Sequence, residues 1–337
     1  MTRTFKKNWP VVALSALIAI GLVLPVATGQ SAPGFFIEVL LGGLMSGVLY
    51  SLVALGFVLI FKASGVFNFA QGAMVLFAAL SVARLSEFMP LPLAVLGGVA
   101  IMVVLAWLVE RLVLRHLVNQ EGVVLLMATL GITYFLDGFG QTLWGSDIYK
   151  IDLGLPKTPT IVAEGMFQGG ILINSEDLIA AAVAAALVGV LALFFQKTAT
   201  GRALRAVADD HQAAQSIGIP LNTIWVIVWS VAGVVAIVAG MIWGSKLGVQ
   251  FSLSLIALKA LPVVILGGLT SVPGAIIGGL IIGVGEKMAE VFLGPVLVKT
   301  FDLAGGGIEN WFAYVLALLF LLVRPEGLFG ERHIDRV

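Results

Sequence analysis

Few side chains in this sequence could do chemistry, and their spacing argues against catalysis. The 337 residues include no cysteine, which excludes disulfides, thiolate metal sites and a cysteine nucleophile. His116, His211 and His333 lie in polar segments and lack the spacing of metal ligands. No Gly-x-x-x-x-Gly-Lys-Ser/Thr run is present, so the chain has no phosphate-binding loop. We therefore predict no catalytic residue, no metal and no cofactor bound by this chain.

The composition indicates a membrane protein. Hydrophobic residues make up 60 % of the chain and charged residues 11 %, whereas soluble domains carry about 25 % charged residues. The formal net charge is zero, so no global field would attract nucleic acid. Forty glycines suit helices that pack closely within a lipid bilayer. These features predict an all-α, polytopic helical bundle.

Apolar runs of about the length that crosses ~30 Å of hydrocarbon recur along the sequence. They are residues 11–27, 35–61, 70–83, 91–109, 123–143, 178–195, 224–243, 255–268, 275–287 and 311–323. We expect about nine to ten spans, depending on whether residues 1–30 form a retained helix or a signal-like segment. Residues 31–337 would form one transmembrane domain.

Two carboxamides interrupt the second and third apolar runs, near residues 63–72. Asn68 and Gln71 are three positions apart and would share one face of a helix. A carboxamide in hydrocarbon costs several kcal/mol if it is unpaired. Two interpretations remain open: bonds that fix helix packing, or a broken helix that lines a solute path, with Gly72 beside it.

A second interruption is expected near residues 266–275. Two short, glycine-interrupted apolar segments flank Thr270, Ser271 and Pro273, a pattern typical of discontinuous helices beside a transport pathway. Plain close packing of glycines explains the same pattern equally well. Thr270 and Ser271 complete the candidate substrate path.

The most polar stretch, residues 196–222, is predicted to lie in the cytoplasm because basic residues flank the spans on that side. Arg202 and Arg205 would share one face of a turn and could meet acidic groups of a partner or lipid phosphates. Ala213 and Ala214 would give a short helix a small, dockable face, which Gly218 would end. Alternatively, the loop is merely solvated and its arginines set the topology. The connection 144–177 would lie on the opposite side.

Three motifs together resemble one transporter family. They are Leu49-Tyr-Ser-Leu-Val-Ala-Leu-Gly-Phe with Phe67-Asn-Phe-Ala-Gln-Gly, Thr200-Gly-Arg-Ala-Leu-Arg-Ala-Val-Ala, and Ala260-Leu with Leu266-Gly-Gly-Leu and Pro273-Gly. The similarity is to the LivH-type permease of branched-chain amino acid ABC importers, from about residue 36 to the end. Gln212-Ala-Ala-x-x-x-Gly also resembles the coupling loop of ABC importer permeases, with Gln in place of Glu. Phe-Ala-Gln-Gly stands where the family usually has Phe-Ala-His-Gly.

The resemblance implies a transport subunit of the bacterial inner membrane, not an enzyme. Its expected partners are a LivM-like second permease, two ATP-binding subunits that hold ATP and Mg²⁺, and a periplasmic substrate-binding protein. Segment 196–222 would then be the cytoplasmic coupling loop, and 144–177 would be periplasmic. Branched-chain or other hydrophobic amino acids are the expected solutes, with urea or short-chain amides as the alternative.

Two other classes of function remain as alternatives, an ion-coupled carrier that works alone and a non-transporting scaffold. A carrier usually keeps an ionisable group at mid-depth in the membrane. The candidates for such a group are Glu38, Asp137, Lys259, Glu286 and Lys287, most of them near the ends of expected spans. The sequence therefore favours a permease that depends on a partner for energy.

Overall fold

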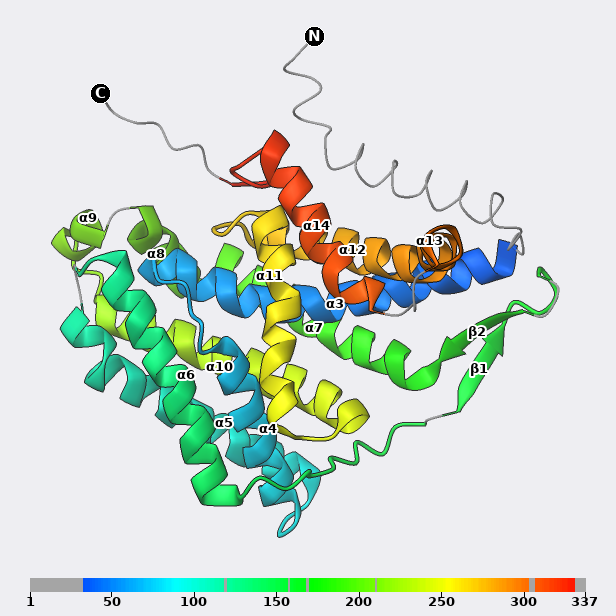
Figure 1. The fold of residues 1–337 in the computed structure, drawn as a ribbon. Helices are drawn as coiled ribbons and strands as arrows, with labels where there is room; N and C mark the ends of the chain where they lie inside the picture. Colours follow the sequence, from blue (N-terminus) through cyan, green and yellow to red (C-terminus); the bar gives the residue numbers. More distant parts are fainter. Residues whose placement is uncertain are drawn as a thin grey trace.

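A computed structural model describes residues 33–117, 120–156, 158–167, 170–209, 211–302 and 307–330 (Figure 1). In these residues the chain is a bundle of helices, as its composition predicts. The helix or signal-like segment expected over residues 1–30 lies outside the described residues.

The helices follow the expected apolar runs closely, because each run is long enough for regular helix and ends at a polar or glycine-containing segment. The first half of the described chain contains α3 (Pro33–Ser64), α4 (Gln71–Ser86), α5 (Leu91–Leu112), the 3-10 turn η1 (Leu114–Leu117) and α6 (Gly122–Trp144). The second half contains α7 (Ser175–Lys197), α8 (Ala199–Asp209), α9 (His211–Ser216), α10 (Leu221–Leu247), η2 (Phe251–Leu255), α11 (Ile256–Gly267), α12 (Val272–Met288), the π-helical turn η3 (Ala289–Leu293), α13 (Gly294–Phe301) and α14 (Ile308–Val323).

Fewer helices reach span length than the sequence suggests. Within the described residues, α3, α5, α6, α7 and α10 are long and apolar enough to cross a membrane, and the bent pair formed by residues 251–267 and 272–301 makes up to six spans. Helices α4 and α14 are apolar but have 16 residues each, which corresponds to about 24 Å of helix. The expected nine to ten spans counted these short helices, and each half of the bent pair, as complete crossings.

The bundle is built around α3, whose 32 residues pack against α12 through glycines. Gly43 and Gly47 on α3 face Gly279 and Gly283 on α12, and each pair is four residues apart, the spacing that lets two helix backbones touch. A Cβ atom at Gly47 would lie 2.7 Å from the carbonyl oxygen of Gly279. Ser51 Oγ adds a bond across the contact, donating to the carbonyl of Ile276 (3.1 Å).

Two short strands, β1 (Pro159–Val162) and β2 (Ile171–Asn174), form an antiparallel hairpin in the connection between α6 and α7. The sequence does not predict these strands, because each has four residues and lies in a stretch rich in turn-forming types. Asn174 ends the hairpin and starts α7, since its side-chain oxygen accepts a bond from Glu176 N–H (3.1 Å).

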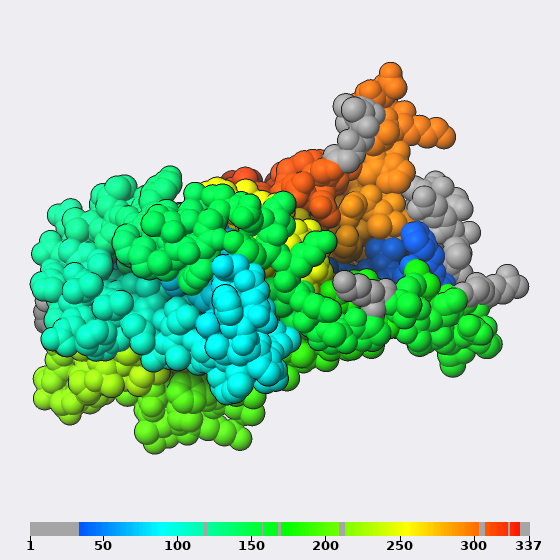
Figure 2. Space-filling view, turned by 90° about the horizontal axis from the view of Figure 1, so that it is seen from below, coloured from blue at the N-terminus to red at the C-terminus, as the bar shows by residue number. Residues whose placement is uncertain are grey.

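Helices α3 and α7 both run the length of the molecule and define its two ends. The start of α3 lies beside the hairpin, and its last turns lie near α8 (Figure 1). Figure 2 shows the same arrangement from another side, with the blue start of α3 between the green hairpin region and the orange end of α12. We call these the hairpin end and the α8 end.

Candidate functional site

The first expected break is present, between α3 and α4, and side chains from two other helices hold it. Trp225 Nε1 on α10 donates to the carbonyl of Ala63 (3.1 Å), and Thr129 Oγ1 on α6 donates to the carbonyl of Phe67 (3.2 Å). Backbone carbonyls that a helix would have satisfied are therefore paired by neighbours, as the low dielectric of a bundle core demands.

Asn68 and Gln71 are both fully buried in this break. Asn68 Oδ1 accepts from Ala70 N–H (3.1 Å), and its Nδ2 donates to Gln71 Oε1 (3.3 Å). Gln71 Nε2 has no hydrogen-bond partner among the described residues and lies against Gly56. In this conformation the two carboxamides organise the break, and neither touches solvent.

Gly72 is the point where α4 meets η2, directly before the start of α11. Its backbone lies against the carbonyl of Ser254 so closely that any Cβ would overlap it. Only glycine fits here, which explains its place directly after Gln71.

The second expected break is the turn between α11 and α12, where the chain bends by 115°. Ser271 Oγ accepts from Gly274 N–H (3.1 Å) and so caps α12. Leu328 N–H and Phe329 N–H donate to the carbonyls of Leu266 and Gly267 (2.8 and 3.1 Å), which satisfies the end of α11. The segment after α14 thus fixes this turn.

Thr270 and Ser271 line a cavity of about 200 Å³ at the α8 end. Other lining residues come from α3, α7 and α8, and include Lys62, Phe195 and Arg205. Gly72 lies beside the opposite end of α11. Helix α11 has 12 residues and is therefore about 18 Å long. The five residues expected along a path therefore form two separate groups in this conformation.

The two arginines of segment 196–222 turn back onto their own chain. Arg205 donates to the carbonyls of Phe195 and Gln196, and Arg202 Nη1 donates to the carbonyl of Lys197 (3.2 Å). These carbonyls end α7, where the helix dipole favours positive charge. The arginines therefore clamp α8 to the end of α7, and Arg202 remains exposed.

The short helix expected near residue 212 is α9, which follows α8. Gly218 ends it with φ +87°. A Schellman motif closes the turn, because Gly218 N–H donates to the carbonyl of Gln215 (3.0 Å) and Ile219 N–H donates to the carbonyl of Ala214 (3.0 Å). The two alanines differ, since Ala213 is exposed and Ala214 is buried within this chain. The outer face of α9 thus carries Ala213 and, one turn on, Ile217, which is 74 % exposed.

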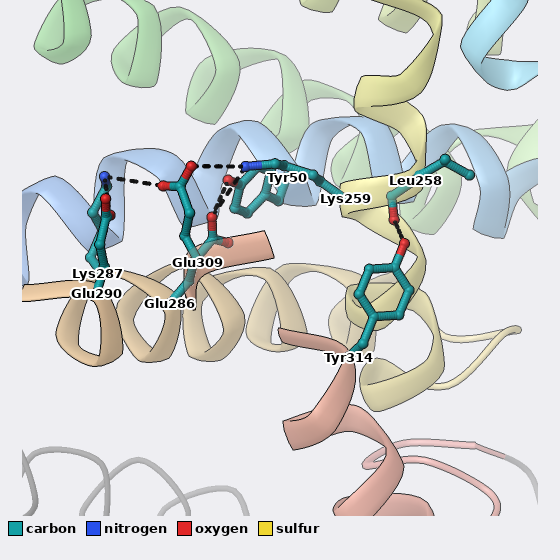
Figure 3. Close-up of polar contacts among 8 residues, drawn as sticks. All are labelled: Tyr50, Leu258, Lys259, Glu286, Lys287, Glu290, Glu309 and Tyr314. Atoms are coloured by element: carbon teal, nitrogen blue, oxygen red, sulfur yellow. Dashed lines mark hydrogen bonds and ion pairs between the residues drawn. The ribbon is translucent and has the colours of Figure 1, made fainter. Parts of the chain in front are cut away.

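The structure also gathers charged residues that the sequence left scattered (Figure 3). Glu286 on α12 is buried, and its Oε1 accepts from Tyr50 on α3 (3.0 Å) and lies 3.5 Å from Lys259 Nζ on α11. Glu309 on α14 lies 3.7 Å from Lys259 and 3.8 Å from Lys287, measured from carboxylate oxygen to Nζ. Glu290 completes the group, 3.0 Å from Lys287.

We call these six residues the Glu286 network. It joins α3, α11, α12, η3 and α14. The Lys287–Glu290 pair is local, three residues apart, whereas the other contacts join residues well separated in the chain and no local spacing reveals them. Lys259, Glu286 and Lys287 are recognisable from the sequence as charges in apolar surroundings. Tyr50 and Glu309 carry no such signal, because their pairing depends on how α3 and α14 pack against α11 and α12. Glu290 lies three residues after Lys287, a spacing at which helical side chains pair.

Within the described ranges, no group of three or more His, Asp or Glu residues could hold a metal ion.

Comparison with known proteins agrees with this picture. The family described as "Branched-chain amino acid transport system / permease component" matches residues 39–324. The high-affinity branched-chain amino acid permease LivH of Salmonella typhimurium is 25 % identical over 325 residues, covering 90 % of this chain and 98 % of LivH. BraD of Pseudomonas aeruginosa, a permease of the same description, is 27 % identical over 314 residues, with the same two coverages.

A third relative, from Methanocaldococcus jannaschii, is named "Probable branched-chain amino acid transport permease protein LivH". It is 30 % identical over 303 residues, which cover 87 % of this chain and 92 % of the relative. The family match spans both breaks, the Glu286 network and segment 196–222. The chain is a multi-pass membrane protein and belongs to the branched-chain amino acid transport permease family of ABC transporters, as a transport subunit and not an enzyme.

Proposed function

We propose that this chain is the permease of an ATP-driven importer in a bacterial inner membrane, and that it carries branched-chain or similar aliphatic amino acids. It acts with a LivM-like second permease, two ATP-binding subunits that hold ATP and Mg²⁺, and a periplasmic substrate-binding protein. The names of its relatives support this solute class.

The observation that carries the proposal is the packing that connects α8 to the bent pair α11–α12 through α3. Helix α8 packs against α3, and α3 packs against both α11 and α12. Arg205 bonds the end of α7 and lines the cavity that Thr270 and Ser271 also line. A push on α8 or α9 would therefore reach the bent pair through α3. Binding of ATP by the partner subunits would supply that push, and rocking of the broken helices would open the path alternately to each side.

The exposed face of α9 is the proposed docking surface for an ATP-binding subunit. Ala213→Arg would place a bulky charge on it, and Gly218→Trp would strain its end, because φ +87° disfavours any side chain. We expect both variants to insert normally but to lose stimulation of ATP hydrolysis by the loaded binding protein. Unchanged stimulation in both would refute this coupling role.

Gln215→Arg is the matched control, because Gln215 is exposed on the same helix but lies about 200° around it from Ala213. It adds the same charge away from the proposed docking face and should keep ATPase stimulation. Proteoliposomes containing only this chain, under a proton or sodium gradient, provide a second control. Amino acid uptake by that preparation would favour an ion-coupled carrier.

A substrate screen separates the two permease alternatives. The complex, with its binding protein, is assayed for uptake of labelled leucine, isoleucine, valine, urea and acetamide. Saturable uptake of the aliphatic amino acids supports the proposal, whereas uptake of urea or acetamide alone would assign the chain to the short-amide importers.

A further inference from the structure

A second cavity lies at the hairpin end, on the opposite side of the molecule from the coupling segment. It has a volume of about 480 Å³. We call it the hairpin-end cavity, and its walls come from the start of α3, the hairpin, the start of α7 and the end of α12. The lining residues used below are Phe35, Glu38, Val39, Gly42, Leu172 and Lys287.

The size of this cavity suits a small solute. Ligand pockets generally measure roughly 300–1,000 Å³, and 480 Å³ falls near the lower part of that range. An amino acid of the size of leucine would fit with space for water. A peptide or a large cofactor would not be enclosed.

One wall carries a carboxylate with bonding capacity left. Glu38 Oε2 accepts a bond from Leu172 N–H (3.1 Å), which fixes the side chain, and Oε1 accepts no hydrogen bond from the described part of the chain. Asp177 also lines the cavity and forms an ion pair with Lys246. Among the described residues Glu38 forms no ion pair, so we assign the ammonium of the solute to Glu38.

The other wall carries a cation. Lys287 Nζ lies 3.0 Å from Glu290 and 3.8 Å from Glu309, and an ammonium has three donors. Its side chain is 36 % exposed, so a third donor can reach a solute carboxylate. The carboxylate of Glu38 and the ammonium of Lys287 lie on different helices and suit a solute that carries both charges. A solute that lacks either charge leaves one of these two groups without a partner and binds less well.

Between the charges the surface is apolar. Phe35 and Val39 come from α3 and Leu172 from β2, and a Cβ at Gly42 would meet nothing within 4 Å. Gly42 thus leaves room that a branched aliphatic side chain can occupy. An apolar pocket with a few placed polar groups is the usual design of a small-molecule site.

We propose that the hairpin-end cavity binds an aliphatic α-amino acid as a zwitterion, with its ammonium at Glu38 and its carboxylate at Lys287. The cavity is the receiving site on the side opposite α8 and α9, where a binding protein would release its solute. This inference rests on the proposed function and adds to it a position and two recognising residues.

The test uses photo-leucine, a diazirine analogue of leucine, on the purified complete complex. After irradiation, labelled peptides are identified by mass spectrometry with and without excess leucine. We expect leucine-protected labelling within residues 35–45 or 172–174. Isoamylamine and 4-methylpentanoate, which each lack one charge, should protect about tenfold less well, the factor that corresponds to one charge-assisted contact.

Two variants address the site from different directions. Glu38→Gln removes the charge with little change in shape and should reduce protected labelling about tenfold. Gly42→Leu fills the cavity without changing charge and should abolish labelling. Gly189→Leu is its matched control, because Gly189 is an exposed helical glycine on α7 whose Cβ would also meet open space.

The outcomes separate this site from the proposed function. Import of leucine without protected labelling at these peptides would overturn the site and leave the proposed function standing. Protected labelling in a complex that imports only urea or acetamide would overturn the proposed solute. Equal loss of labelling in the Gly42 and Gly189 variants would also refute the site.

Discussion

At the scale of single residues, buried polar side chains in this protein hold irregular backbone in place. Trp225 and Thr129 bond carbonyls that the break between α3 and α4 leaves unpaired, and Ser271 caps the helix after the second break. Each bond satisfies a group that would otherwise be costly in a low-dielectric interior. Breaks in membrane helices persist because neighbouring side chains complete them.

Gly56 and Gln71 should be energetically coupled. A Cβ at Gly56 would lie 2.5 Å from Gln71 Nε2, so Gly56→Ala must displace the amide that bonds Asn68. We expect the substitution to cost about 1–3 kcal/mol more with Gln71 present than in a Gln71→Ala background. Thermal unfolding in detergent of the native protein, the two single variants and the double variant gives this difference. The helix propensity of alanine at position 56 cancels, because the same substitution is made in both backgrounds. Equal effects in both backgrounds would contradict the contact.

Lys259 should matter because it neutralises a buried carboxylate. Lys259→Met leaves Glu286 with Tyr50 as its remaining partner and also removes the ion pair to Glu309. We expect a loss of about 1–3 kcal/mol, reduced from the cost of breaking a fully buried pair because Lys259 is one-third exposed. Adding Glu286→Gln should restore part of the stability.

The control for that prediction is Lys299→Met, which removes an exposed lysine of α13. It should leave the unfolding midpoint nearly unchanged. If the variants at 259 and 299 behave alike, the Glu286 network does not stabilise the fold.

At the scale of elements, hydrophobic runs and their interruptions were sufficient to predict the long apolar helices and both breaks, but not α8 or α13. Glycine and proline around residue 270 and the carboxamides near residue 70 mark positions where a regular helix is unfavourable, and both predictions are confirmed. The hairpin was missed because its strands are too short to show alternation. The direction of Arg202 and Arg205 was missed because it depends on where α8 folds relative to α7.

The assignments of function to residues stay predictions. Asn68, Gln71 and Gly72 were expected on a solute path, yet such a path forms between helices and between subunits, which one conformation of one chain does not contain. Segment 196–222 likewise becomes a coupling loop only through its partner. Sequence patterns can identify these residues as unusual, because placing polar groups in a membrane costs free energy. Their roles, however, depend on the assembly.

The contact between α3 and α12 should be intolerant of any side chain at Gly47. Gly47→Leu would direct its Cβ to 2.7 Å from a backbone oxygen of α12, which cannot move as a side chain can. We expect the two helices to separate, with loss of a monodisperse peak in size-exclusion chromatography and a lower unfolding temperature. Gly189→Leu, at an exposed helical glycine with open space around its Cβ, should behave like the native protein. Normal behaviour of the Gly47 variant would mean that this packing is wrong.

At the scale of the whole molecule, the two ends differ in the way a vectorial transporter requires. One end holds α8, α9 and the cavity with Thr270 and Ser271, and the other holds the hairpin and the hairpin-end cavity. Helix α7 joins them, and its 23 residues correspond to about 34 Å, enough to cross the ~30 Å hydrocarbon core. Its first turn carries Glu176 and Asp177 and its last turn Lys197, so the chemistry of the ends differs as well.

This arrangement predicts opposite accessibility for two single cysteines, and the absence of native cysteine makes the experiment direct. Met166→Cys, between the strands, and Ile217→Cys, at the end of α9, replace side chains that are 83 % and 74 % exposed. In spheroplasts, a membrane-impermeant maleimide should label position 166, while position 217 should react only after permeabilisation. Labelling of both positions in intact spheroplasts would show that α7 does not cross the membrane. Labelling of position 217 alone would invert the proposed orientation and place α9 out of reach of any ATP-binding subunit.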